Sequence, residues 1–244
     1  MKETISVHKA VLISGLAYLG VFVISTIGST LGIEHLLVRD NAAITFENIS
    51  NQTDLFRFGI FCLFLVIVCD IIVAWGLYIM FRPVNKDLSL FTAWFRIVFS
   101  VIYAIAILNL FFVTNFTNAA EYLASFDSTY MQSQVMLLVT KYDSLVRLSF
   151  IFFGIHIGLL AYLIKKSDFV PDYLAYMLGV AFVGYMIDSF GNFLSKSYSN
   201  SEINLFIIFV AIPAVISEFT FTIWLLFKGR KIKQTDIGTD ATVS

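Results

Sequence analysis

The chain has 244 residues, of which 59% are hydrophobic and only 14% are charged, and its formal net charge is −1. Soluble domains contain about 45–50% apolar and about 25% charged residues, so this composition excludes an ordinary soluble domain and favours a partner that is a lipid bilayer. The balanced charge also provides no basic surface for nucleic acid, and no nucleic-acid partner is predicted.

Six apolar runs are long enough to cross a bilayer, because a spanning helix needs about 20 mostly apolar residues. Each run is predicted to be α-helical, since backbone groups in hydrocarbon must bond within the segment. In chain order the runs are 10–32, 58–81, 90–116, 144–164, 172–193 and 203–227. The sequence therefore predicts an all-α membrane protein, a polytopic bundle of about six transmembrane helices. Its predicted parts are a cytoplasmic leader (1–9), the six-helix domain (10–228) and a disordered cytoplasmic tail (229–244).

Orientation follows from the lysines and arginines, which are enriched in cytoplasmic links. Six crossings place both termini on one side, and most of the basic residues lie on that side, including those of the short links "RPVNKD" and "KKSDFVPD". Both termini are therefore predicted to be cytoplasmic. The outside links, near 33–56 and 117–143, are longer. The second has apolar residues at close to helical spacing and is predicted to carry a short helix on the membrane surface.

Ionisable residues inside a spanning helix cost about 2.5–3.5 kcal/mol each on insertion scales, so they normally face the bundle interior and find partners. Asp70, Arg96, His156 and Glu218 lie on four different predicted helices. At 1.5 Å per residue, all four fall roughly 12–18 Å from the cytoplasmic edge. We therefore predict that they form one interior polar cluster. His156 would be the member most able to change charge between about pH 5 and 8.

A second polar layer is predicted closer to the outside. Arg147 and Asp188 match in depth to about 3 Å by the same helical rise, which makes them a candidate ion pair. Asn109 and Asn192 lie near that level.

The helical faces agree with this interior placement. At 100° per residue, one polar stripe on the third predicted helix contains Ser89, Thr92, Arg96, Ser100 and Tyr103. Such a stripe on an apolar helix indicates a face turned toward other helices.

Glycines indicate where helices approach one another closely. Gly154 and Gly158 form a G-x-x-x-G face, which allows close helix contact, and His156 points to the opposite side of the same helix. Gly28 and Gly32 repeat the pattern on the first helix.

Several stretches resemble a known family. They are "AAITFENISNQTDLFRFGI", "CDIIVAWGLYIMFRPVNKDLSLFTAWFRIV", "FFGIHIGLLAYLI" and "PAVISEFTFTIWLLFKG". The chain is similar, from about residue 10 to 230, to bacterial integral-membrane proteins of domain-of-unknown-function family 4386. The resemblance implies a multi-helix membrane protein of bacterial type, and it implies no activity. The expected location is the bacterial cell (inner) membrane.

Three functions remain open from the sequence. Buried titratable groups suit a small-molecule or proton-coupled transporter. A non-catalytic sensor or scaffold needs only a bundle whose buried charges fix the helix register. An intramembrane hydrolase is less favoured, because neither His8 nor His35 can join His156 and no nucleophile motif is present. No catalytic residue, metal site or cofactor is predicted, and a metal held by Asp70, His156 and Glu218 is a less favoured alternative. The oligomeric state is left open.

Overall fold

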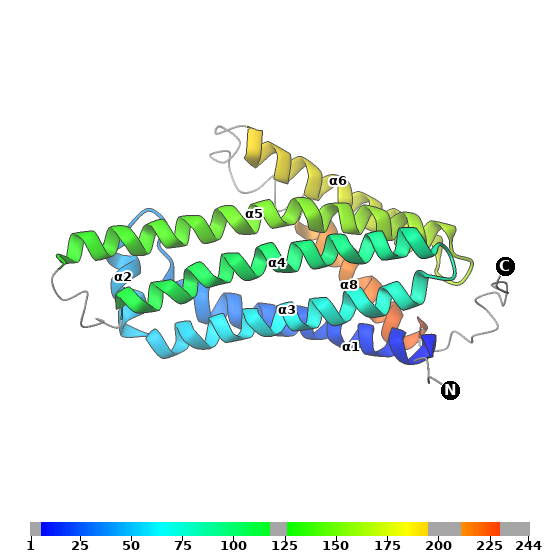
Figure 1. The fold of residues 1–244 in the computed structure, drawn as a ribbon, viewed down its shortest axis with the longest axis horizontal. Coiled ribbons are helices and arrows are strands. Elements are labelled where there is room, and N and C mark those ends of the chain that lie inside the picture. Colours follow the sequence, from blue (N-terminus) through cyan, green and yellow to red (C-terminus); the bar gives the residue numbers. More distant parts are fainter. Residues whose placement is uncertain (1–5, 118–125, 195–210, 230–244) are drawn as a thin grey trace. The chain divides into compact units, whose positions relative to one another are not determined.

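All of the regular structure in the described residues is helical, as a computed structural model of the chain shows (Figure 1). The structure describes residues 6–117, 126–194 and 211–229. The elements are α1 (Val7–Thr26), which continues through a π-helical segment (Ile27–Ile33) and a 3-10 turn (Glu34–Leu36), α2 (Ala42–Asn51), α3 (Thr53–Phe81), α4 (Lys86–Thr117), α5 (Ser128–Lys166), α6 (Asp172–Leu194) and α8 (Ile212–Phe227). The predicted all-α membrane fold is confirmed.

Five of the helical segments in the described residues are long and apolar enough to cross a membrane: α1 with its extension to Leu36, α3, α4, α5 and α6. These correspond to the first five predicted runs. The sixth run, 203–227, is represented by the shorter apolar helix α8, and its residues 203–210 lie outside the described residues. Most of the predicted leader and tail also lies outside them.

The starts of several helices are set by polar caps. The Asn85 side chain accepts a hydrogen bond from the Leu88 amide (2.9 Å) at the start of α4, and Asp127 accepts one from Tyr130 (2.6 Å) at the start of α5. Such caps satisfy backbone donors that the first helical turn leaves unpaired. The cap at Asp127 explains why α5 starts at Ser128, sixteen residues before the predicted boundary at 144. The prediction that 128–143 belongs to a link was therefore wrong.

The described chain divides into two compact units. Unit 1 takes its residues from Met1–Leu19, Asp70–Phe99 and Leu148–Ser244, and unit 2 from Gly20–Cys69 and Ser100–Arg147. The long helices α1, α3, α4 and α5 contribute residues to both units.

In unit 1, α1 and α8 are antiparallel neighbours. Gly15 in the middle of α1 approaches Leu225 and Leu226 near the end of α8, and Tyr18 bonds to Glu218 about two turns earlier in α8. The first residues of α1 and the last residues of α8 therefore lie at the same end of unit 1.

The α5–α6 pair is a close-packed hairpin. Gly154 contacts Tyr185 and Met186 of α6, and Gly158 contacts the ring of Phe182. A side chain at either glycine would overlap these residues, so the predicted contact face is used for α6 packing.

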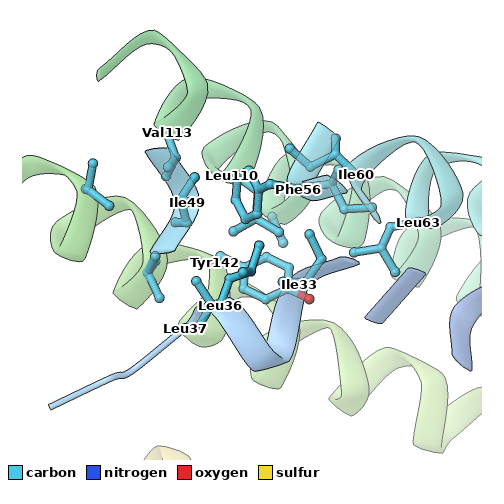
Figure 2. Packing of buried hydrophobic residues seen from close by; sticks show 14 of the residues in the cluster. Ile33, Leu36, Leu37, Ile49, Phe56, Ile60, Leu63, Leu110, Val113 and Tyr142 are labelled. Carbon is cyan, nitrogen blue, oxygen red and sulfur yellow. The ribbon is translucent and has the colours of Figure 1, made fainter. Parts of the chain in front are cut away.

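Unit 2 has an apolar core, shown in Figure 2. Its buried residues come from the end of the first helical segment and from α2, α3, α4 and α5, and include Ile33, Leu36, Ile49, Phe56, Leu63, Leu110, Val113 and Tyr142. The π-helical segment packs closely on α3, because Gly32 lies against the backbone of Gly59 and Gly28 lies against Cys62. The absence of side chains at these glycines permits this approach.

A charged clasp of Glu34, Arg39 and Asp143 joins the segment after α1 to α5 within unit 2. Arg39 donates from Nε and Nη2 to the two Asp143 oxygens (2.8 and 3.0 Å) and from Nη1 to Glu34 (2.9 Å). The hydrogen bonds to Asp143, and secondarily those to Glu34, raise the pKa of Arg39 further above its ordinary value, although partial burial opposes the shift.

Candidate functional site

Arg96 is the centre of a buried polar network inside unit 1. Its Nη2 donates to Asp70 Oδ1 in an ion pair, and its Nη1 donates to the Tyr18 hydroxyl (3.1 Å) and lies 3.2 Å from His156 Nε2. The Arg96 side chain is 1% exposed and that of Asp70 is 3% exposed. One guanidinium therefore joins α1, α3, α4 and α5.

The partners of His156 fix its tautomer. Its Nδ1 lies 2.9 Å from the Thr92 carbonyl oxygen, which can only accept, so Nδ1 carries the proton. Nε2 faces Arg96 Nη1, which can only donate, so Nε2 is the acceptor. Both ring nitrogens of an uncharged imidazole are thus in use. A second proton would place two cations in direct contact, which disfavours the predicted charge change at His156.

Glu218 is held by two tyrosines. Tyr18 donates to Oε2 (3.3 Å) and Tyr185 donates to Oε1 (2.9 Å). Since Tyr18 also accepts from Arg96, its hydroxyl connects the guanidinium to Glu218. The network, as used below, consists of Tyr18, Asp70, Arg96, His156, Tyr185 and Glu218.

Aromatic rings cover the guanidinium on two sides. The Arg96 Cζ lies 4.6 Å from the ring centroid of Tyr18 and 5.4 Å from that of Phe153. Aromatic faces attract cations, and the attraction is stronger where water is excluded. Phe153 also meets Tyr185 edge to face at 5.4 Å. The rings therefore position both Arg96 and the tyrosine that binds Glu218.

The predicted polar stripe on α4 explains how Arg96 reaches this position. Ser89, Thr92, Arg96 and Ser100 are all buried. Ser89 donates to the Tyr78 carbonyl of α3 (3.0 Å), and Thr92 supplies the carbonyl that orients His156. The part of the stripe from Ser89 to Arg96 thus faces α3 and α5 within unit 1.

The four residues predicted for the inner layer lie together, and the connections differ from a simple cluster of four. Asp70 and His156 contact Arg96 directly, whereas Tyr18 connects Arg96 to Glu218 by accepting from the guanidinium and donating to the carboxylate. Pro213 lies in the first turn of α8, one turn before Glu218.

The residues of the predicted outer layer fall in both units. Arg147 and Asn109 belong to unit 2, and Asp188 belongs to unit 1. Asn109 donates to the carbonyls of Ile105 (2.9 Å) and Ala106 (3.4 Å) in its own helix. Asn192 lies on α6, and its side chain is outside the described part of the structure. The pairing of Arg147 with Asp188 stays a prediction.

Sequence reasoning missed the two tyrosines. A tyrosine in an apolar helix is an ordinary residue, so neither position stands out by composition. The available signal was spacing: Tyr18 follows Ser14 by one turn, and Tyr185 precedes Asp188 by almost one turn. That signal places both on polar faces without naming their partners.

The arrangement does not resemble a metal site. Within the described residues, no three His, Cys, Asp or Glu side chains converge to hold a metal ion. Arg96 occupies the Nε2 face of His156 and one oxygen of Asp70, so the alternative site of Asp70, His156 and Glu218 would place a metal ion against a guanidinium. This geometry disfavours the metal-dependent hydrolase considered from the sequence.

Comparison with known proteins gives the family. The model of the family described as "Domain of unknown function (DUF4386)" matches residues 13–229, nearly the whole chain. The chain belongs to this family. All members of the network lie inside the matched range. The resemblance found in the sequence is therefore confirmed.

A relative from Archaeoglobus fulgidus, described as an uncharacterized protein, is 30% identical over 177 residues, covering 72% of this chain and 87% of the relative. No solved structure matches the chain. Because this relative is archaeal, the bacterial source expected from the resemblance stays a prediction.

Proposed function

We propose that this membrane protein is a proton-coupled transporter of a small molecule, and that Glu218 is the group that takes up and releases the proton. The observation that carries the proposal is that the two buried acids, Asp70 and Glu218, have different kinds of hydrogen-bonding partner. Asp70 is bonded to the fixed charge of Arg96, whereas Glu218 is held by two neutral hydroxyls. A hydroxyl can donate or accept, so it can serve a carboxylate and a carboxylic acid equally.

The two hydroxyls are not equivalent. Tyr18 already accepts from Arg96, so its own proton is directed at Glu218 Oε2. The Tyr185 hydroxyl donates to Glu218 Oε1. A proton added at Oε1 can be accommodated if the Tyr185 hydroxyl turns to accept it. We therefore assign Oε1 as the protonated atom and Tyr185 as the hydroxyl that reverses.

The remaining network members position this pair. Arg96 orients Tyr18, Asp70 balances the charge of Arg96, and His156 holds Arg96 from the α5 side. Intramembrane ionisable groups in such arrangements commonly mark proton or substrate paths. A change at Glu218 would reach α1 through Tyr18 and α6 through Tyr185, which are the helices that a transport cycle would move relative to α8.

Proton binding is tested without knowing the substrate. Trp224 lies less than two turns from Glu218, and its ring stacks on Phe221 (6.2 Å, 6°). Its fluorescence should therefore change as the pH is varied across the transition of Glu218. We expect this transition to be absent in Glu218→Gln and retained in Glu47→Gln, an exposed acid of α2 that serves as control. An unchanged transition in Glu218→Gln would contradict the assignment.

Transport itself is tested in proteoliposomes that contain a pH-sensitive dye. Small organic cations, anions and neutral solutes are added outside in turn under an imposed pH gradient. The proposal expects at least one of them to drive proton movement in wild type and in Glu47→Gln but not in Glu218→Gln. Proton movement that is the same in Glu218→Gln as in wild type would refute it.

A second candidate is a non-catalytic sensor or scaffold, in which the network only fixes the register of the helices. The observation in its favour is the enclosure of Arg96 between two rings and three hydrogen-bonding partners. In that case Glu218→Gln would lower stability without removing a pH-dependent signal. The fluorescence titration separates this candidate from the transporter.

For localisation, we propose an inner membrane protein of a bacterial cell with residues 10–228 as its membrane domain and both termini in the cytoplasm. The support is the excess of basic residues at the start of α1, at the end of α8 and in the links after α3 and α5. Reporter fusions at Ser244 and in the link at Asn85 should both report a cytoplasmic position. A reporter that reads external at either site would overturn this topology.

A further inference from the structure

One end of unit 1 gathers basic side chains. The ring of Phe81, at the end of α3, stacks on that of Phe169 in the link between α5 and α6, with centroids 5.9 Å apart. This contact brings the α3–α4 link and the α5–α6 link together. The start of α1 and the end of α8 also lie side by side, since Gly229 lies against Val11. The basic end, as used below, comprises Lys9, Arg82, Lys86, Lys165, Lys166 and Lys228.

The positive charge of the basic end is only partly balanced. Asp87, Asp168 and Asp172 are the acidic residues in its described links and helix ends, so positive charge is in excess. Lys165 pairs with Asp172. Among the described residues, Arg82, Lys86 and Lys166 form no ion pair, and all three are exposed. These three cations are available to an anion.

Aromatic residues surround the same end. Tyr162 and Tyr176 are 53% and 63% exposed, and Lys166 and Lys165 respectively lie over their rings (5.6 and 5.0 Å). Trp75 and Trp94 are also exposed on α3 and α4. They lie seven and eight residues from Arg82 and Lys86, about 10–12 Å along the helix axis. Exposed tyrosines and tryptophans next to lysines are typical of the headgroup level of a bilayer.

We infer that the basic end is a binding surface for anionic phospholipids, whose phosphate groups contact Arg82, Lys86 and Lys166. The argument is charge complementarity: unpaired cations sit at the level where the aromatic belt places the lipid phosphates, and anionic headgroups attract such clusters. The inference is independent of the transport proposal, because none of these residues belongs to the network.

The two exposed tryptophans of α3 and α4 provide the measurement. Trp75 and Trp94 lie within about two helical turns of Arg82 and Lys86, whereas Trp224 is buried. The full chain is reconstituted in phosphatidylcholine vesicles that contain a small fraction of a lipid with brominated acyl chains, which quench tryptophan on contact. Brominated phosphatidylglycerol is compared with brominated phosphatidylcholine at the same mole fraction.

Phosphatidylglycerol is expected to quench more strongly, and high salt should reduce the difference. In Arg82→Gln/Lys86→Gln the relative association of phosphatidylglycerol should fall by up to about fivefold for each charge removed. Lys166→Gln is a second test variant for the case in which the double variant folds poorly. Within the protein it loses only the contact of Lys166 with the Tyr162 ring. The matched control is Arg57→Gln/Lys141→Gln, which removes two exposed cations from unit 2.

Three outcomes would overturn the inference. They are equal quenching by the two brominated lipids, an equal loss in the test and control double variants, and loss of the preference when inorganic phosphate replaces chloride at constant ionic strength. The last outcome would assign the surface to a free anion instead of a lipid.

Discussion

Asp70 and Arg96 are 26 residues apart, on the two arms of the α3–α4 hairpin, and their side chains form an ion pair that is almost fully enclosed by protein. Because Arg96 also bonds to Tyr18 and His156, the pair is part of a network that connects α1, α3, α4 and α5 within unit 1.

Removing one partner of the pair should be strongly destabilising. Asp70→Ala leaves the Arg96 guanidinium buried without its counter-charge, which typically costs about 3–5 kcal/mol. Thermal unfolding of the purified protein measures the loss, with Asp87→Ala, an exposed acid at the start of α4, as control. The double variant Asp70→Leu/Arg96→Met should recover much of the stability, because it removes both charges. A double variant no more stable than Asp70→Ala would show that the ion pair is not the cause.

The two tyrosines should differ in cost. Tyr18→Phe removes the acceptor of Arg96 and the donor to Glu218, whereas Tyr185→Phe removes one donor only. A buried polar group that loses its partner costs about 1–3 kcal/mol, so Tyr18→Phe should lower stability more than Tyr185→Phe. The transport proposal adds a distinct expectation, namely that Tyr185→Phe alters the pH dependence of Trp224 fluorescence. Equal unfolding temperatures for the two variants would contradict the bridging position of Tyr18.

Two glycines provide a matched test of close packing. A Cβ at Gly32 would overlap the backbone of Gly59, which cannot move aside as a side chain can, whereas a Cβ at Gly179 would meet no atom within 4 Å. Gly32→Ala should therefore destabilise by about 1–3 kcal/mol through overpacking. Gly179→Ala in α6 should be neutral or stabilising by up to about 1 kcal/mol, the difference in helix propensity. If thermal unfolding shows the same sign for both, the contact between the π-helical segment and α3 is not as close as described.

The clasp in unit 2 should give a modest, salt-dependent coupling. Arg39 and Asp143 are partly exposed, so a double-mutant cycle with Arg39→Ala and Asp143→Ala should yield about 0.5–1 kcal/mol, less at high salt. The charge-swapped double variant Arg39→Asp/Asp143→Arg should be more stable than either single swap. Additive effects of the two single alanine variants would show that the contact contributes nothing.

The same clasp has a defined pH dependence on the arginine side. Bonding to Asp143 holds the pKa of Arg39 above its ordinary value, and a raised pKa contributes stability that is complete below the unfolded pKa and lost only above it. The ordinary pKa of arginine already lies well above pH 10. The coupling measured by the cycle should therefore be the same at pH 7 and at pH 10. A coupling that falls over this interval would mean that Arg39 is not the cation of the clasp.

The sequence by itself determined the helices and the axial level of their charges. The lengths of the apolar runs locate the spans. Asp70 and Arg96 lie a similar number of residues from the short link that Asn85 caps, so the helical rise predicts that they are at a similar depth. Helical periodicity also placed His156 opposite the Gly154 and Gly158 face. These inferences need only the geometry of one helix and the cost of charge in lipid.

Only the tertiary structure decided which side chains meet. Tyr18 carries little sequence signal, and it joins Arg96 to Glu218 because α1 packs beside both α4 and α8 in unit 1. The uncharged state of His156 likewise depends on two partners, the Thr92 carbonyl and the Arg96 guanidinium, that both lie on another helix. The rotation of a helix about its axis is set by packing against its neighbours. A hydrogen bond requires donor and acceptor to be placed to within a fraction of an ångström, and this placement depends on the rotation of both helices. No periodic pattern in a single chain specifies it.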